Sequence, residues 1–283
     1  MNTFLHQPRL AADDLFSALR TLLPQRQPVR STTTAGVEVM SLLVAADKVR
    51  DIWGEWRGRH GETGWWPFVS TMTPEGLTSG GRLSEGVDAA VLESMVAEVV
   101  CQDHDARAAS ILLADFLWTT DPAYLDEGEF EEWLDEYDPD RLAHRLGPAI
   151  TEPLPGVFRW VPEEPNTYYW RDQWWLHFVP ARGGYEVPVM LPGLISTGNN
   201  PTHYLPPADD AALLRRWHEQ WGAELFYASG PYLELVVDQP PLDPRSAAQA
   251  AAELRGYCDD TVDESQITGD GMARSTVWSL WWD

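Results

Sequence analysis

The chain is poor in lysine, in cysteine and in long apolar runs. Lys48 is the single lysine among 20 basic residues, against 44 acidic ones, which leaves a net charge of −24. A chain this acidic lacks the basic footprint that a nucleic-acid backbone or an anionic lipid surface requires, so we expect neither partner. Apolar runs such as residues 42–46 are far shorter than the ~20 residues of a membrane-spanning helix, so none is expected.

Cysteine is scarce as well. The two cysteines, Cys101 and Cys258, form no disulfide framework. The histidines and Cys258 lie at spacings that match no short metal-ligand motif. The first ten residues do not combine a positive segment with an apolar core, so no secretory signal is predicted. We therefore expect a cytoplasmic protein that uses no cofactor and no metal.

The pattern of apolar residues predicts an α+β fold. Helical periodicity predicts amphipathic helices over residues 10–23, 49–60, 209–221 and 244–255. Strands are expected over residues 37–44, 65–69, 158–161, 174–179, 185–191, 224–228, 232–238 and 277–282. This composition of elements predicts a mixed, largely antiparallel β-sheet flanked by amphipathic helices. The β-α-β order over residues 37–70 favours a parallel pair of strands joined by a right-handed crossover.

A proline-rich segment, residues 148–155, is the strongest candidate for a boundary. It predicts an N-terminal α/β region, residues 1–147, which includes an acidic helical segment. The C-terminal α+β domain would cover residues 156–283. The sequence leaves open whether the N-terminal strands extend the sheet of the C-terminal domain or form a second sheet.

Fifteen tryptophans are the most unusual feature of the composition. Trp217 and Trp221 lie one helical turn apart, beside two leucines, and so predict a buried helix face. Adjacent tryptophans such as Trp65 and Trp66 point to opposite faces of a strand. We therefore expect a hydrophobic core on both faces of the sheet, with exposed partner-binding tryptophans as the alternative.

Residues 121–140 carry ten acidic residues and no basic one. Phe130, Trp133 and Tyr137 recur at the offsets of one helical face, which predicts an acidic amphipathic helix. Its acids form either a solvated face, a docking surface for a basic partner, or a mimic of a nucleic-acid backbone. The candidate partner-binding acids are Glu129, Glu131, Glu132, Asp135 and Glu136.

Several short segments resemble those of a known family. They comprise Trp221-Gly222-Ala223-Glu224-Leu225, Asp238-Gln239-Pro240-Pro241, Tyr257-Cys258-Asp259-Asp260 and Trp281-Trp282-Asp283. With them the chain resembles the bacterial family described as domain of unknown function 4253, most strongly over about residues 174–283. Residues 63–67, 179–181 and 198–200 resemble upstream parts of the same proteins. Asp259 departs from the proline common in the family. The resemblance implies little about activity. The one role that it suggests, for some members of the family, is the neutralisation of a toxin.

Two function classes follow. The first hypothesis is a non-enzymatic protein-binding module, immunity-like or adaptor-like, with a partner protein that is basic. The alternative is a hydrolase-like enzyme with an unrecognised site in its loops, for which the candidate pocket residues are Asn199, Asn200, His203 and Cys258. No phosphate-binding glycine loop or nucleophile elbow is present, so no catalytic residue is assigned. The acidic neighbours of Cys258 disfavour a reactive thiolate.

Overall fold

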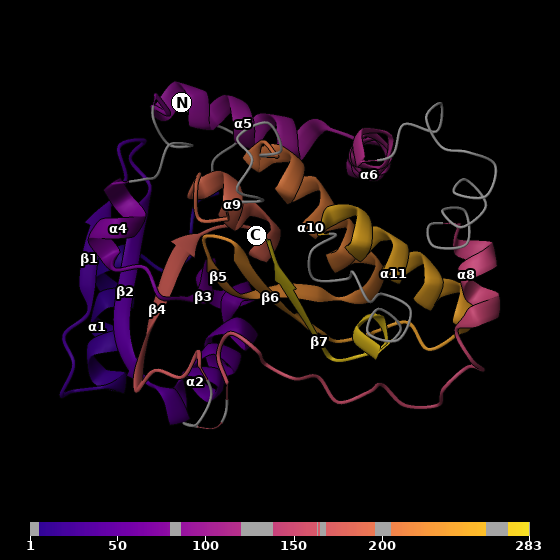
Figure 1. Cartoon of the computed structure of the whole chain (residues 1–283). Helices are drawn as coiled ribbons and strands as arrows, with labels where there is room; N and C mark the ends of the chain where they lie inside the picture. Colours follow the sequence, from indigo (N-terminus) through magenta and orange to yellow (C-terminus); the bar gives the residue numbers. More distant parts are fainter. Residues whose placement is uncertain are drawn as a thin grey trace.

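The computed structural model describes residues 6–79, 86–119, 138–162, 164, 168–195, 205–258 and 271–282. One β-sheet organises these residues, and helices cover it (Figure 1). Its strands are β1 (Val29–Thr32), β2 (Glu38–Ala45), β3 (Trp65–Ser70), β4 (Gln173–Pro180), β5 (Ala223–Ser229), β6 (Tyr232–Val237) and β7 (Val277–Trp281). The predicted α+β class is confirmed.

The seven strands lie in the order β1-β2-β4-β3-β5-β6-β7. Every neighbouring pair is antiparallel except β3 and β5, which are parallel. The sheet is therefore mixed and largely antiparallel, as predicted. Strands from both predicted parts of the chain alternate in it, so the N-terminal strands extend the same sheet.

The described residues also form helices. They are α1 (Ala12–Leu22), α2 (Ala46–Gly58), α3 (His60–Thr63), α4 (Pro74–Ser79), α5 (Ala89–Cys101), α6 (His104–Thr119), α8 (Pro139–Arg145), the 3₁₀ turn η2 (Gly184–Glu186), α9 (Val187–Met190), α10 (Pro207–Trp221) and α11 (Pro244–Tyr257). None of these helices is both long and apolar enough to cross a membrane.

Two hydrophobic cores lie on opposite faces of the sheet. Trp65 packs in the core beneath α1 and α2, whereas Trp66 packs in the core beneath α10 and α11. Both side chains are buried. Because neighbours in a strand point to opposite faces, this pair alone requires core on both sides. The predicted two-sided core is confirmed.

Local signals fix where several elements begin and end. The Asp243 side chain accepts hydrogen bonds from the first backbone N–H groups of α11, with Pro244 at its first position. Gly222 ends α10 with φ +63°, a conformation that favours glycine. Asp209 and Asp210, at the predicted start of this helix, lie buried in its first turn, because the helix begins earlier, at Pro207.

Two strand predictions were wrong. Residues 158–161 form bends, and residues 185–191 form η2 and α9. Both segments bury apolar side chains. A short buried apolar run has the same sequence pattern whether or not it forms a strand, which explains the wrong prediction. The predicted parallel pair over residues 37–70 is also corrected. β4 inserts between β2 and β3 and is antiparallel to both, so those two strands share a direction without pairing.

The contribution of the core beneath α10 to stability can be tested by a substitution at Trp217. Its side chain is fully buried, contacts Tyr257 and Trp278 edge-on, and donates its indole N–H to Glu253 Oε2 at 3.0 Å. We expect Trp217→Ala to lower the free energy of unfolding by ~3–5 kcal/mol, measured by chemical denaturation. Tyr168→Ala removes an aromatic side chain that is 94% exposed and serves as the control. Equal midpoints for the two variants would contradict the expectation.

Candidate functional site

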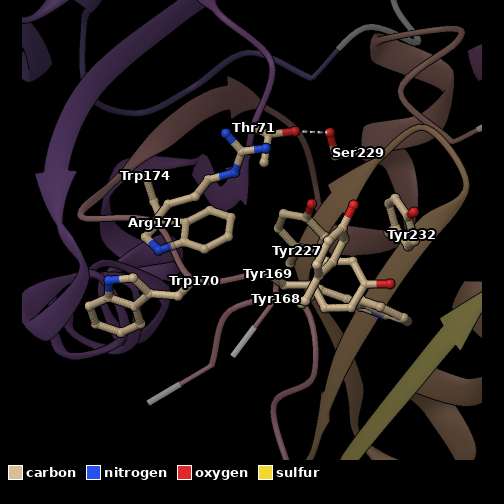
Figure 2. Close-up of a pocket in the computed structure, with 10 residues that line it drawn as sticks. Thr71, Tyr168, Tyr169, Trp170, Arg171, Trp174, Tyr227, Ser229 and Tyr232 are labelled. Carbon is tan, nitrogen blue, oxygen red and sulfur yellow. Dashed lines mark hydrogen bonds between the residues drawn. The ribbon is translucent and has the colours of Figure 1, made fainter. Parts of the chain in front are cut away.

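A hollow lies at the edge of the sheet where the parallel strands β3 and β5 end. Thr71 directly follows β3, and Ser229 is the last residue of β5. Their hydroxyl groups are hydrogen-bonded to each other (Figure 2). Because parallel neighbours end at the same edge, the chain brings these two residues together across 158 positions of sequence. Open sheets commonly bind ligands outside the carboxyl ends of such strands.

Aromatic side chains form most of the wall. The cavity has a volume of about 440 Å³, and we call it the aromatic hollow. Its lining comprises seven aromatic residues, two hydroxyl residues and one arginine: Thr71, Trp160, Tyr168, Tyr169, Trp170, Arg171, Trp174, Tyr227, Ser229 and Tyr232. Among the described residues, no acidic side chain contributes to this lining. The described lining therefore carries one formal positive charge, from Arg171, in a chain whose net charge is −24.

The rings support one another. Trp160 lies 4.8 Å from Tyr169 and 4.7 Å from Tyr232, measured between ring centroids, and Tyr168 lies 5.2 Å from Tyr169. The Trp160–Tyr169 and Tyr168–Tyr169 pairs are edge-to-face, and such contacts contribute roughly 0.5–1.5 kcal/mol each beyond the area that they bury. Trp160 is buried and ties this group to the core, whereas Tyr168 is almost fully exposed at the rim. The ring contacts therefore run from the buried Trp160 through Tyr169 to the exposed Tyr168.

The polar groups of the hollow are hydrogen-bond donors. The guanidinium of Arg171 lies 5.9 Å from the Trp174 ring, and among the described residues it forms no ion pair or hydrogen bond. The neighbouring Asp172 instead accepts from the indole N–H of Trp170 at 3.4 Å. Burial raises the pKa of Tyr227 to about 12, so its hydroxyl keeps its proton at neutral pH. The buried indole N–H of Trp174 has no hydrogen-bond partner within the described ranges.

Glu234 on β6 anchors the segment that carries Trp160. Its Oε1 accepts from the backbone N–H groups of Arg159 and Trp160 and, at 3.0 Å, from the hydroxyl of Ser279. Its Oε2 is buried and has no partner in the part of the chain that the structure describes. Because burial disfavours the charged form, the pKa of Glu234 rises to about 7. This carboxyl group replaces the strand pairing that residues 158–161 lack.

A second, shallower hollow lies beside the same segment. It has a volume of about 410 Å³, and we call it the apolar hollow. Its lining comprises Leu154, Pro155, Val157, Arg159, Gly271, Met272, Ser275, Val277 and Ser279. Leu154 pairs through its backbone with residues 274 and 276, which holds its side chain beside β7. Arg159 and Trp160, neighbours in sequence, thus contribute to different hollows.

One buried histidine has a structural role. Ser41 on β2 and His177 on β4 are directly paired, and the Ser41 hydroxyl lies 2.8 Å from His177 Nδ1. His177 Nε2 lies 3.2 Å from the Met72 carbonyl oxygen and donates to it, so Nδ1 accepts from Ser41. Both side chains are fully buried, and burial lowers the pKa of His177 to about 3. A neutral serine–histidine pair without access to solvent joins two strands.

The residues predicted from the sequence are only partly described. Cys258 is buried after α11, and its thiol donates to the Trp281 carbonyl oxygen at 2.9 Å. Asn199, Asn200 and His203 lie outside the described residues, and so do the candidate acids Glu129, Glu131, Glu132, Asp135 and Glu136. These assignments stay predictions. Within the described ranges, no group of three or more His, Cys, Asp or Glu side chains could hold a metal ion.

The sequence patterns do not predict the aromatic hollow. Its rim comes from the run Tyr168-Tyr169-Trp170-Arg171, which follows a stretch without a helical or strand pattern. Four consecutive residues that combine three aromatic rings with one cation form a signal that could have been recognised. Thr71 and Ser229 could not have been recognised as part of this wall, because only the parallel register of β3 and β5 brings them to this position.

The comparisons with known proteins identify the C-terminal part of the chain. The structure defines an α+β protein with an open mixed sheet and an aromatic hollow at its edge. Residues 176–283 match the family model described as Domain of unknown function (DUF4253), which confirms the resemblance over that range. No curated protein and no solved structure matches the chain. Tyr227, Ser229 and Tyr232 lie in the matched range, and the other lining residues of the aromatic hollow lie upstream of it.

Glu234 predicts a specific dependence of stability on pH. Its pKa is about 7 in the folded chain and 4.5 for the free group, so the folded state binds more protons between these values. The free energy of unfolding therefore falls as pH rises toward about 7 and through it. We expect Glu234→Gln, which keeps the Oε1 acceptor and cannot ionise, to lose less stability than the wild type between pH 6 and pH 8.

Chemical denaturation at several pH values measures this difference. Asp210, whose pKa burial raises to about 8, contributes a decline of the same sign that remains in the variant. Glu152→Gln, a change at an exposed carboxyl group, is the matched control and should follow the wild type. A Glu234→Gln variant whose stability declines as steeply as that of the control would show that the buried carboxyl group does not titrate in this range.

Proposed function

We propose that this protein is a non-enzymatic protein-binding module, and that it binds its partner through the exposed strip formed by Leu154, Val157, Tyr168 and Tyr169. One observation supports this assignment. Among the described residues, five large apolar side chains are exposed, and four of them are these four. They lie in one segment of 16 positions, whereas Val91, the fifth, lies on α5. Contiguous exposed apolar surface is characteristic of protein interfaces.

The chemistry of the strip favours a partner of a particular kind. Tyrosine, tryptophan and arginine are the residues most enriched among side chains that dominate binding energy, and all three line the two hollows beside the strip. A partner that presents apolar side chains to the strip would bury Val157, which is 71% exposed, and Tyr168. The net charge of −24 attracts a basic partner and repels an acidic one. We place this association in the bacterial cytoplasm.

The strip can be tested without disturbing the fold. Val157→Ser and Tyr168→Ser change side chains that are mostly exposed, so the free energy of unfolding should stay within about 0.5 kcal/mol of the wild type. We expect each change to weaken binding of the partner captured from the native host by about tenfold or more, because interface anchors contribute at least about 1–2 kcal/mol. The measurement is the equilibrium dissociation constant for that partner.

Val91→Ser is the matched control, since it removes an exposed apolar side chain 42% accessible to solvent and remote in sequence from the strip. It should bind the partner as the wild type does. A partner whose affinity is unchanged by Val157→Ser and Tyr168→Ser, or reduced equally by Val91→Ser, would show that the strip is not the interface.

The acidic segment predicts how fast the partner associates. Replacing Glu129, Glu131, Glu132, Asp135 and Glu136 by Gln removes five negative charges. Because opposite charges steer the encounter of two proteins, we expect a slower association rate at low salt and little change in the dissociation rate. The difference should vanish as ionic strength rises above about 0.15 M, where screening limits exposed charges to about 8 Å. An unchanged association rate would mean that these acids form only a solvated surface.

A further inference from the structure

We propose that the aromatic hollow is a small-molecule site, and that it binds a compound carrying an anionic group on a flat aromatic ring, with Arg171 holding the anion. This assignment goes beyond the binding of a partner protein. It depends on the geometry of the ten lining residues and on the charge of that lining.

The polar part of the wall selects an anion. Arg171 supplies a positive charge that no acidic residue of the lining or ion pair with a described residue neutralises. In Figure 2 its guanidinium extends toward the end of the hollow where the hydroxyls of Thr71 and Ser229 lie. A guanidinium presents a planar fork of N–H donors that matches a carboxylate or a phosphate. Hydroxyl groups add donors at the same end, so an oxygen anion would be held from two sides.

The apolar part of the wall selects a flat ring. Tyr168 is almost fully exposed at the rim, whereas Trp160 and Tyr227 are buried parts of the lining. Aromatic faces pack well against another flat ring. The volume of about 440 Å³ lies within the roughly 300–1,000 Å³ of typical small-molecule sites. A ring with one anionic substituent therefore fits within the hollow and brings a negative charge to Arg171.

Isothermal titration calorimetry with four simple compounds tests this inference. Phenyl phosphate and benzoate carry both the ring and an anion, benzyl alcohol carries the ring alone, and inorganic phosphate carries the anion alone. We expect at least one of the first two to bind about tenfold or more tightly than either of the last two. The comparison of phenyl phosphate with benzoate shows whether the preferred anion is a phosphate or a carboxylate.

Two variants locate the site. Arg171→Gln should weaken binding of the preferred anion by about tenfold or more, as expected for a hydrogen bond to a charged group. Arg159→Gln removes the same charge from the neighbouring apolar hollow and should leave the affinity unchanged. The inference is wrong if neither aromatic anion binds more tightly than benzyl alcohol and inorganic phosphate, or if Arg171→Gln binds as tightly as the wild type. Since Arg171 and Arg159 are both exposed, both variants are expected to fold.

Discussion

The parallel contact between β3 and β5 is the constraint on which the rest of the structure depends. Among the described strands it is the only parallel pairing of neighbours, and a single register pair, Val69 with Tyr227, defines it. Pro67 lies within β3 and has no N–H to donate to a neighbouring strand. Tryptophan side chains compensate, since Trp53 donates to the Pro67 carbonyl oxygen and Trp66 donates across to the Leu225 carbonyl oxygen. Indole hydrogen bonds therefore support the contact between β3 and β5, where the backbone pairing is limited to one register pair.

This junction explains how a core on both faces and a hollow at one edge arise together. Trp53 lies on α2 on one face of the sheet, and Trp66 points to the other, so both cores close against the same pair of strands. At the carboxyl end of the pair the strands stop together, and the hydroxyls of Thr71 and Ser229 bond across the gap. Most of the described tryptophans are therefore buried in the two cores, and Trp170, Trp175 and Trp281 are the described ones that stay partly exposed.

Sequence patterns predicted the regular elements well because their signals are local. Gly222 and Asp243 mark helix ends through backbone geometry and side-chain caps, and the hairpin of β5 and β6 follows directly from its turn. The insertion of β4 between β2 and β3 was not predicted, because no local signal states which distant strand pairs with which. The aromatic hollow was missed for the same reason. Its walls come from segments around residues 71, 160–174 and 227–232, which only the completed sheet brings together.

Both proposed binding surfaces depend on a segment that has neither helix nor strand at its centre. Residues 158–161 are held because the backbone N–H groups of Arg159 and Trp160 donate to Glu234 Oε1, which also accepts from the Ser279 hydroxyl. That oxygen can accept hydrogen bonds whether the carboxyl group is protonated on its other oxygen or ionised, so the contact with the segment does not require one protonation state. Trp160 and Arg159, on either side of one peptide bond, are thereby fixed in different hollows. A fixed backbone lowers the entropic cost of ordering the surface on binding, which is the physical reason that irregular chain can serve as an interface.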